Sequence, residues 1–209
     1  MSFPRLYALT DASAPGSHVE QVREYADAGV RIIQVRDKLA SSRALHETVV
    51  AALEITRPRG VRLIVNDRVD VALAAGADGV HVGQDDLPAE SAREILGPLA
   101  IIGISTHSLA QAVAAANLPV DYVAIGPVFA TSTKANPDPV VGLEGLRAVR
   151  AVRAAVTTPL VAIGGITLEK APAVFAAGAD SVAVVSDLRA GASVGERVRA
   201  YLGLSDSRS

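Results

Sequence analysis

The chain has no cysteine and no tryptophan, and only 3% of its 209 residues are aromatic. Without cysteine it can form neither a disulfide framework nor a thiolate metal site. Because aromatic rings are scarce and half of the residues are hydrophobic, the core must consist mainly of alanine, valine, leucine and isoleucine. That composition predicts an interior filled by aliphatic side chains.

A strong net charge and long apolar runs are also missing. The formal net charge of -2 leaves no positive excess for binding nucleic acid or an anionic membrane surface. No apolar run approaches the length that spans a bilayer, and the N-terminal segment lacks the apolar stretch of a secretory signal. We therefore expect a cytoplasmic protein with neither nucleic-acid nor membrane partners.

What the chain does contain is a repeated pattern of short apolar runs, each followed by an alanine-rich stretch of helical character. The eight runs fall at 6–9, 32–35, 63–65, 80–82, 101–104, 122–125, 160–163 and 182–185. The intervening helices are expected near 17–28, 42–57, 69–76, 88–97, 108–117, 143–156, 168–178 and 190–202. Eight alternating strands and helices predict an α/β chain that forms one single-domain (β/α)8 TIM barrel over 1–209, with a flexible tail from about 204.

TIM barrels place their chemistry at the C-terminal ends of the strands, and here the second run ends in cations. Gln34, Arg36 and Lys38 are spaced two apart, which on a strand would direct all three to one face. An amide, a guanidinium and an ammonium converging on the barrel mouth indicate a phosphate or diphosphate ligand. The structural alternative is that the two cations pair with neighbouring acids.

Acidic residues follow the third and fourth runs. Asn66 and Asp67 end the third, and Asp85 and Asp86 come after the fourth. One carboxylate from each of two neighbouring strands, together with phosphate oxygens of a substrate, is a usual way to hold Mg²⁺. Capping of the following helices is the competing explanation for Asp67 and Asp86.

The last two runs end on Gly164-Gly165 and Ser186, where this fold commonly binds phosphate through backbone N–H groups. The glycines could instead serve only a tight turn. The segment 130–141 is the longest expected loop at this end of the barrel. Its length and polarity are typical of a lid or ligand clamp, with a tolerated insertion as the alternative.

The histidines form no recognisable catalytic or metal-binding pattern. His81 lies within the fourth run and could be either a core imidazole or a catalytic one, while His107 could line the mouth. His18 and His46 are expected on helix surfaces. Neither a Ser-His-Asp arrangement nor metal-ligand histidine spacing is apparent, which disfavours a hydrolase or a zinc enzyme.

An ordered set of motifs resembles the thiamine phosphate synthase family, and the resemblance covers nearly the whole chain. The motifs are QVRDK (34–38), VNDR (65–68), HVGQDDLP (81–88), GISTH (103–107), GPVFATSTK (126–134), AIGGI (162–166) and VVS (184–186). The family joins a pyrimidine methyl diphosphate to a thiazole phosphate, releasing diphosphate and forming thiamine monophosphate. The resemblance therefore implies a transferase of thiamine biosynthesis that uses Mg²⁺ and two phosphorylated small molecules.

The same resemblance implies a role for each matching residue. Asp67 and Asp86 would hold Mg²⁺, and Arg36, Lys38 and Lys134 would be catalytic by neutralising the charge on the departing diphosphate. The residues implied to bind the pyrimidine substrate and its diphosphate are Gln34, Arg36, Lys38, Asn66, Ser105 and Lys134. Those implied to bind the thiazole phosphate are Thr131, Thr133, Gly165, Val185 and Ser186.

Three other functions compete with the synthase. A related thiazole tautomerase would need no metal and would have a histidine where this chain has Pro127. A phosphosugar aldolase or epimerase would be a second barrel enzyme; an aldolase needs a Schiff-base lysine, for which Lys38 is the only strand-end candidate. The third is a non-catalytic phosphate binder.

Two further points stay open in the sequence. The chain departs from the family at Asp187, where small or apolar residues are usual. A carboxylate there would repel the neighbouring phosphate unless it turns away or caps the next helix. The sequence also leaves a homo-oligomer open.

Overall fold

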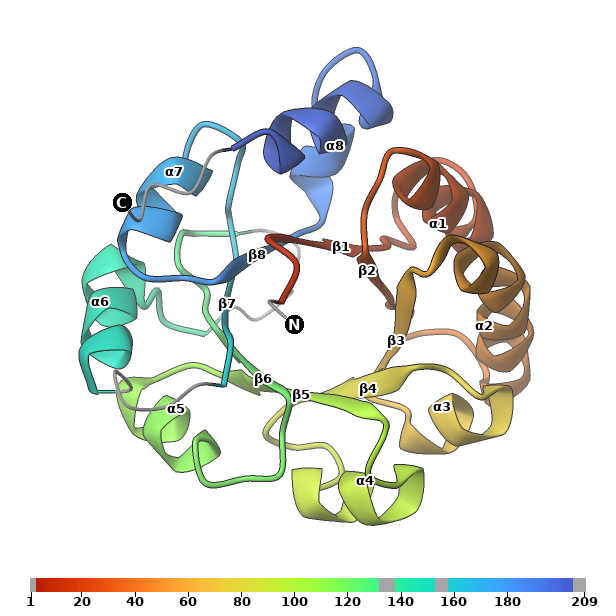
Figure 1. Cartoon of the computed structure of the whole chain (residues 1–209), viewed down its shortest axis with the longest axis horizontal. Coiled ribbons are helices and arrows are strands. Elements are labelled where there is room, and N and C mark those ends of the chain that lie inside the picture. The colour runs from red at the N-terminus through yellow and green to blue at the C-terminus, as the bar shows by residue number, and fades with distance from the viewer. Residues whose placement is uncertain (1–2, 132–137, 153–157, 205–209) are drawn as a thin grey trace.

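The computed structural model describes residues 3–131, 138–152 and 158–204. Eight parallel strands follow one another around a closed barrel, and β1 pairs with both β2 and β8. The strands are β1 (Leu6–Leu9), β2 (Ile32–Val35), β3 (Arg62–Asn66), β4 (Gly79–Val82), β5 (Ile101–Thr106), β6 (Tyr122–Ile125), β7 (Leu160–Ile163) and β8 (Ser181–Val184). Figure 1 shows them as an inner ring. The predicted single-domain TIM barrel is confirmed.

The helices lie outside this ring (Figure 1). They are α1 (His18–Asp27), α2 (Ser42–Thr56), α3 (Val69–Ala75), α4 (Ala89–Leu96), α5 (Leu109–Ala115), α6 (Gly142–Val152), α7 (Ala171–Ala176) and α8 (Val194–Leu202). Several begin at serine caps, such as Ser41, whose hydroxyl accepts the Ala44 N–H. Within the described residues, none of the helices has the length and apolar character needed to cross a bilayer.

The last unit differs from the expected pattern. The strand ends at Val184 rather than Val185, and a separate 3-10 helix, Ser186–Arg189, follows it. Helix α8 then begins only at Val194, because Gly191 takes a φ of 106° and Ser193 caps the new helix. Leu204 packs against the core, while 205–209 of the expected tail lie outside the described residues.

The core has two parts, one between the barrel and the helices and one inside the barrel. The inner part consists of Tyr7, Leu9, Ile32, Ile64, Tyr122, Ala124, Val161 and Ala183. The prediction of an aliphatic interior is wrong at this point, because two tyrosine rings meet edge to face with centroids 5.6 Å apart. Phe3 packs on both rings, in the segment that enters the ring of strands in Figure 1.

Gly103 on β5 creates the space for one of these rings. It pairs in register with Tyr122 on β6, and a Cβ at this glycine would overlap the Tyr122 ring. The absence of a side chain at this position therefore allows the tyrosine to lie across the barrel. There its hydroxyl group reaches His81 on β4, 2.9 Å from the imidazole Nδ1.

Candidate active site

The C-terminal ends of β2, β3 and β4 bring one ammonium and two carboxylates together. Lys38 Nζ lies 3.0 Å from Asp67 Oδ2. Asp86 is close enough to Asp67 for the two carboxyl groups to interact directly. Burial raises the pKa of Asp86, the Gly83 N–H that donates to its Oδ2 at 2.7 Å lowers it, and the Asp67 carboxylate raises it again. The carboxyl groups of Asp67 and Asp86 therefore lie side by side and concentrate negative charge at this point.

Asp67 has an unusual backbone conformation. Its φ of 61° is the only positive value at a non-glycine position among the described residues. Such a conformation costs on the order of 1–3 kcal/mol and is typical of functional sites, where the surrounding structure enforces it. Here the Asp67 N–H donates to the His81 carbonyl at 2.8 Å, which holds the carboxylate at the strand end.

Helix capping does not explain either acid. The N-cap residue of α3 is Arg68 and that of α4 is Pro88, and neither helix has a side-chain cap. Asp86 instead accepts the Gly83 N–H within its own loop. Neither carboxylate is therefore committed to a helix cap.

The paired acids suit Mg²⁺. Within the described residues no group of three or more His, Cys, Asp or Glu side chains could hold a metal ion by itself. Mg²⁺, however, is commonly bound by one or two carboxylates, with waters and substrate phosphate oxygens completing its shell. The mutual repulsion of Asp67 and Asp86, offset here by Lys38, is what a divalent cation would relieve. The assignment of Mg²⁺ to these two residues stays a prediction that this donor set fits.

The end of β2 differs from the expectation of one shared strand face. The strand stops at Val35, so Arg36 and Lys38 belong to the following loop. Gln34 lies inside the barrel, 2% exposed, and its Nε2 donates to the Tyr7 hydroxyl at 2.9 Å. One of the two hydrogens of this amide nitrogen therefore has a buried partner, and the contact of Gln34 with diphosphate stays a prediction.

The two cations of this loop have different surroundings. Lys38 pairs with Asp67. Within the described residues, no hydrogen bond or ion pair engages the Arg36 guanidinium; only its backbone N–H bonds, to Thr10 Oγ1. The structural alternative therefore applies to Lys38 alone, and Arg36 keeps its full capacity for an anion.

His18 braces the loop that carries these cations. Its Nδ1 lies 2.7 Å from Thr10 Oγ1 and its Nε2 lies 3.3 Å from Asp37 Oδ2. Asp37 Oδ1 in turn accepts two backbone N–H groups of the same loop. Hydrogen bonds to these donors and to His18 outweigh burial and lower the pKa of Asp37. The expectation of a helix-surface role for His18 is wrong, because its ring connects three separate segments.

At the far side of the mouth, the two glycines after β7 are required by a close approach. Gly164 and Gly165 have φ values of 98° and 62°, and a Cβ on either would overlap the segment Pro127–Ala130. That segment is held against β7 by backbone hydrogen bonds, including Phe129 N to Gly164 O at 3.0 Å. A tight turn alone is therefore an incomplete explanation for the glycines.

Only some of the residues predicted to bind the thiazole phosphate belong to the part of the chain that the structure describes. Thr131 ends the described part of this connection, and Thr133 and Lys134 lie outside the described residues. Val185 packs against the barrel interior, and Ser186 begins the 3-10 helix with its side chain exposed. The loops after β7 and β8 follow two paired strands, and the loop after β7 packs against the start of the β6–α6 connection.

Asp187 turns away from this place. Its carboxylate accepts the Leu168 N–H at 3.0 Å, the Arg197 Nε–H at 3.0 Å and the Tyr201 hydroxyl at 2.6 Å. The side chain is only 10% exposed, and Arg197 neutralises its charge. The carboxylate is therefore held by two side chains of α8, and it does not repel an anion at Ser186.

His107 connects two neighbouring loops. Its Nδ1 donates to the Gly126 carbonyl at 2.7 Å and lies 3.4 Å from Asp138 Oδ2. Its backbone N–H donates to Gln111 Oε1. The ring thus contacts both described ends of the β6–α6 connection, which is a structural role.

His81 is a buried imidazole with both nitrogens engaged. Burial lowers its pKa to about 4, so the ring is neutral near pH 7. Its Nδ1 lies 2.9 Å from the Tyr122 hydroxyl and its Nε2 lies 2.8 Å from Ser105 Oγ. Sequence reasoning missed Tyr7 and Tyr122 as partners in this region, although tyrosines within strand runs of a chain with few aromatics were a usable signal.

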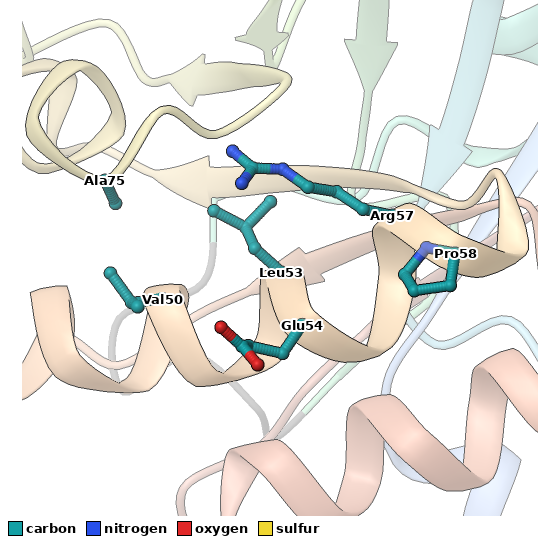
Figure 2. Close-up of a pocket in the computed structure, with 6 residues that line it drawn as sticks. All are labelled: Val50, Leu53, Glu54, Arg57, Pro58 and Ala75. Atoms are coloured by element: carbon teal, nitrogen blue, oxygen red, sulfur yellow. The ribbon is translucent and has the colours of Figure 1, made fainter.

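The outer surface carries a hollow between two helices, away from the barrel mouth. It is lined by Val50, Leu53, Glu54, Arg57, Pro58 and Ala75 (Figure 2). These residues belong to α2, the turn after it and the end of α3. Because the helices run opposite to the strands, the C-terminal ends of α2 and α3 lie far from the strand ends that carry the acids. This hollow is separate from the candidate site.

Known proteins match this chain over most of its length. A family model described as thiamine monophosphate synthase matches residues 6–188. The chain is 49% identical over 196 residues to a thiamine-phosphate synthase of Koribacter versatilis, covering 90% of each chain. It is 48% identical over 197 residues to one of Azorhizobium caulinodans, covering 93% of this chain and 91% of that one. The fold matches the thiamine phosphate pyrophosphorylase of Pyrococcus furiosus with a TM-score of 0.83 and 39% identity, over 94% and 93% of the two chains.

Proposed function

Since the chain belongs to the thiamine monophosphate synthase family and is a transferase with thiamine-phosphate synthase activity, we propose its substrates and mechanism. It joins 4-amino-2-methyl-5-hydroxymethylpyrimidine diphosphate to hydroxyethylthiazole phosphate or its carboxylated form. The products are thiamine monophosphate and diphosphate. The observation that carries the proposal is the convergence of Lys38, Asp67 and Asp86 at the mouth, beside Arg36.

The first step breaks the bond between the pyrimidine methylene carbon and the diphosphate oxygen. Both electrons of that bond leave with the diphosphate, so negative charge grows on the leaving group. Arg36 and Lys38 stabilise that charge, and Lys134 is proposed to join them. Mg²⁺ held by Asp67 and Asp86 would supply further positive charge to the diphosphate oxygens.

The second step forms the carbon–nitrogen bond. The electron-rich aminopyrimidine stabilises the methylene cation, and the thiazole nitrogen attacks it as a neutral nucleophile. No strong base is needed, which accounts for a site with cations and carboxylates whose central imidazole is neutral and fully engaged.

Lys38 can change its partner during this sequence. Its ammonium is half exposed and pairs with Asp67. With Asp67 holding Mg²⁺, Lys38 would be free to turn to the diphosphate. We propose that this exchange keeps the mouth close to charge balance before and after the substrate arrives.

The thiazole phosphate is proposed to bind where the ends of β7 and β8 meet. Gly165, Val185 and Ser186 would contribute backbone N–H and hydroxyl groups, with Thr131 and Thr133 from the neighbouring connection. The outward turn of Asp187 supports this proposal, because its carboxylate is held by Arg197.

Diphosphate release measures the proposal directly. Release should require both phosphorylated substrates and Mg²⁺. Asp67→Ala and Asp86→Ala should each lose at least roughly a hundredfold in turnover while the fold is retained. Asp85→Ala is the matched control, since its exposed carboxylate is adjacent in sequence and should leave activity near that of the wild type.

Other results would contradict the proposal. Full activity in the Asp67 or Asp86 variant, or release without Mg²⁺, would refute the metal assignment. Binding of thiazole phosphate without any diphosphate release would favour the tautomerase-like or non-catalytic alternative.

A further inference from the structure

A continuous chain of side-chain hydrogen bonds crosses the barrel interior and ends at the mouth. Gln34 Nε2 donates to Tyr7 Oη at 2.9 Å, and Tyr7 Oη lies 2.9 Å from Tyr122 Oη. Tyr122 Oη lies 2.9 Å from His81 Nδ1, and His81 Nε2 lies 2.8 Å from Ser105 Oγ. The five residues come from five different strands, and Ser105 is the one that is partly exposed.

The hydrogens in this chain can run in one direction. The Gln34 amide nitrogen can only donate, so the Tyr7 oxygen accepts this hydrogen bond. The Tyr7 hydroxyl then donates its own hydrogen bond to the Tyr122 oxygen. The Tyr122 hydroxyl in turn donates a hydrogen bond to His81 Nδ1. A neutral imidazole has a single N–H, which must therefore be on Nε2 and must donate to Ser105 Oγ.

The opposite direction leaves a buried donor without a partner. If His81 carried its hydrogen on Nδ1, Tyr122 would accept from it and would donate to Tyr7. The Tyr7 oxygen would then accept from both Gln34 and Tyr122, and its own hydrogen would find no acceptor within the described residues. An unmade hydrogen bond in a fully buried position is costly, so this arrangement is disfavoured.

We propose that the chain Gln34–Tyr7–Tyr122–His81 fixes Ser105 as a hydrogen-bond donor toward the substrate. Because Ser105 Oγ accepts from His81, its own hydrogen is available to the mouth. Ser105 therefore recognises a lone-pair-bearing atom of the pyrimidine substrate, and the four other residues are positioning residues. That assignment of the ligand rests on the proposed function, whereas the direction of the chain does not.

The direction can be measured without turnover. In protein labelled with ¹⁵N-histidine, long-range ¹⁵N–¹H correlation at pH 7.5 shows which ring nitrogen carries hydrogen. The His81 signals are identified by their loss in His81→Gln. We expect the Nε2–H form in the wild type. The Nδ1–H form, or a doubly protonated ring, would overturn the proposal.

Tyr7→Phe tests the connection to Ser105. It keeps the ring but removes the link to Gln34, so His81 should show both tautomers. We also expect kcat/KM for the pyrimidine substrate to fall about threefold to tenfold, the worth of one neutral hydrogen bond, with the KM for thiazole phosphate unchanged.

Tyr25→Phe is the matched control, because it removes a buried hydroxyl on α1, outside the barrel interior. Neither the His81 signals nor kcat/KM should change in this variant. Unchanged tautomer and kinetics in Tyr7→Phe would refute the positioning role. A wild type that releases no diphosphate but shows the Nε2–H form would refute the proposed function and leave the hydrogen-bond direction intact.

Discussion

The burial of His81 makes the stability of the fold depend on pH. Burial lowers the pKa of this imidazole from 6.5 to about 4. In the unfolded chain the ring binds a proton near pH 6.5, whereas in the folded protein it stays neutral down to about pH 4. Between these values the unfolded state holds more protons, so the free energy of unfolding decreases as the pH falls.

The size of the effect follows from the difference between the two pKa values. Each pH unit of that difference is worth about 1.4 kcal/mol. The contribution of His81 is absent above pH 7 and reduces the free energy of unfolding by about 2 kcal/mol at pH 5. At pH 4 the reduction approaches about 3 kcal/mol, a large part of the stability of a typical domain.

Urea unfolding at pH 7.5 and pH 5.0, followed by circular dichroism, measures this change. Carboxylates contribute to the pH dependence in every variant, so the informative quantity is the difference between variants. The wild type should lose about 2 kcal/mol more than His81→Gln between the two pH values. His46→Gln, on the partly exposed face of α2, should behave as the wild type does. Equal losses in the wild type and His81→Gln would refute the buried neutral imidazole.

Three further substitutions test other parts of the structure. Gly103→Ala should lower the free energy of unfolding by about 1–3 kcal/mol, because its Cβ overlaps the Tyr122 ring; urea unfolding unchanged from wild type would contradict this packing. Asp187→Ala should lower it by about 3 kcal/mol, because Arg197 and Tyr201 lose a buried partner; a loss below about 1 kcal/mol would show that the network is dispensable. Lys134→Ala should mainly lower kcat in the diphosphate-release assay, since its partner charge develops during the reaction. A pure rise in KM would argue against that role.

The strands were predictable because each is a local pattern. Runs such as Leu6–Leu9, Ile32–Val35 and Leu160–Ile163 consist mainly of apolar residues and are bounded by polar residues, glycine or proline. The observed strands have the same limits. The errors lie at element ends, where the outcome depends on a neighbouring segment. Ser186–Arg189 forms its own short helix because Asp187 is held by α8.

The sequence was also sufficient to identify Asp67 and Asp86 as candidate metal ligands. Their position after consecutive parallel strands places them at one end of the barrel, whatever the details of packing. The sequence could not show that Lys38 pairs with Asp67 or that Asp67 takes a φ of 61°. Nor could it show that Asp67 does not cap helix α3. These depend on loop conformations that no residue pattern specifies.

The sequence by itself determined the order of strands and helices, the barrel that they close and the end at which the charged residues gather. These follow from hydrophobic periodicity and chain direction, which are local properties. Only the tertiary structure decided which side chains meet inside the barrel. Tyr7 and Tyr122 are 115 positions apart, yet their hydroxyls are 2.9 Å apart. That contact exists because closing the sheet brings β1 and β6 to face each other across an interior where Gly103 leaves room for a ring.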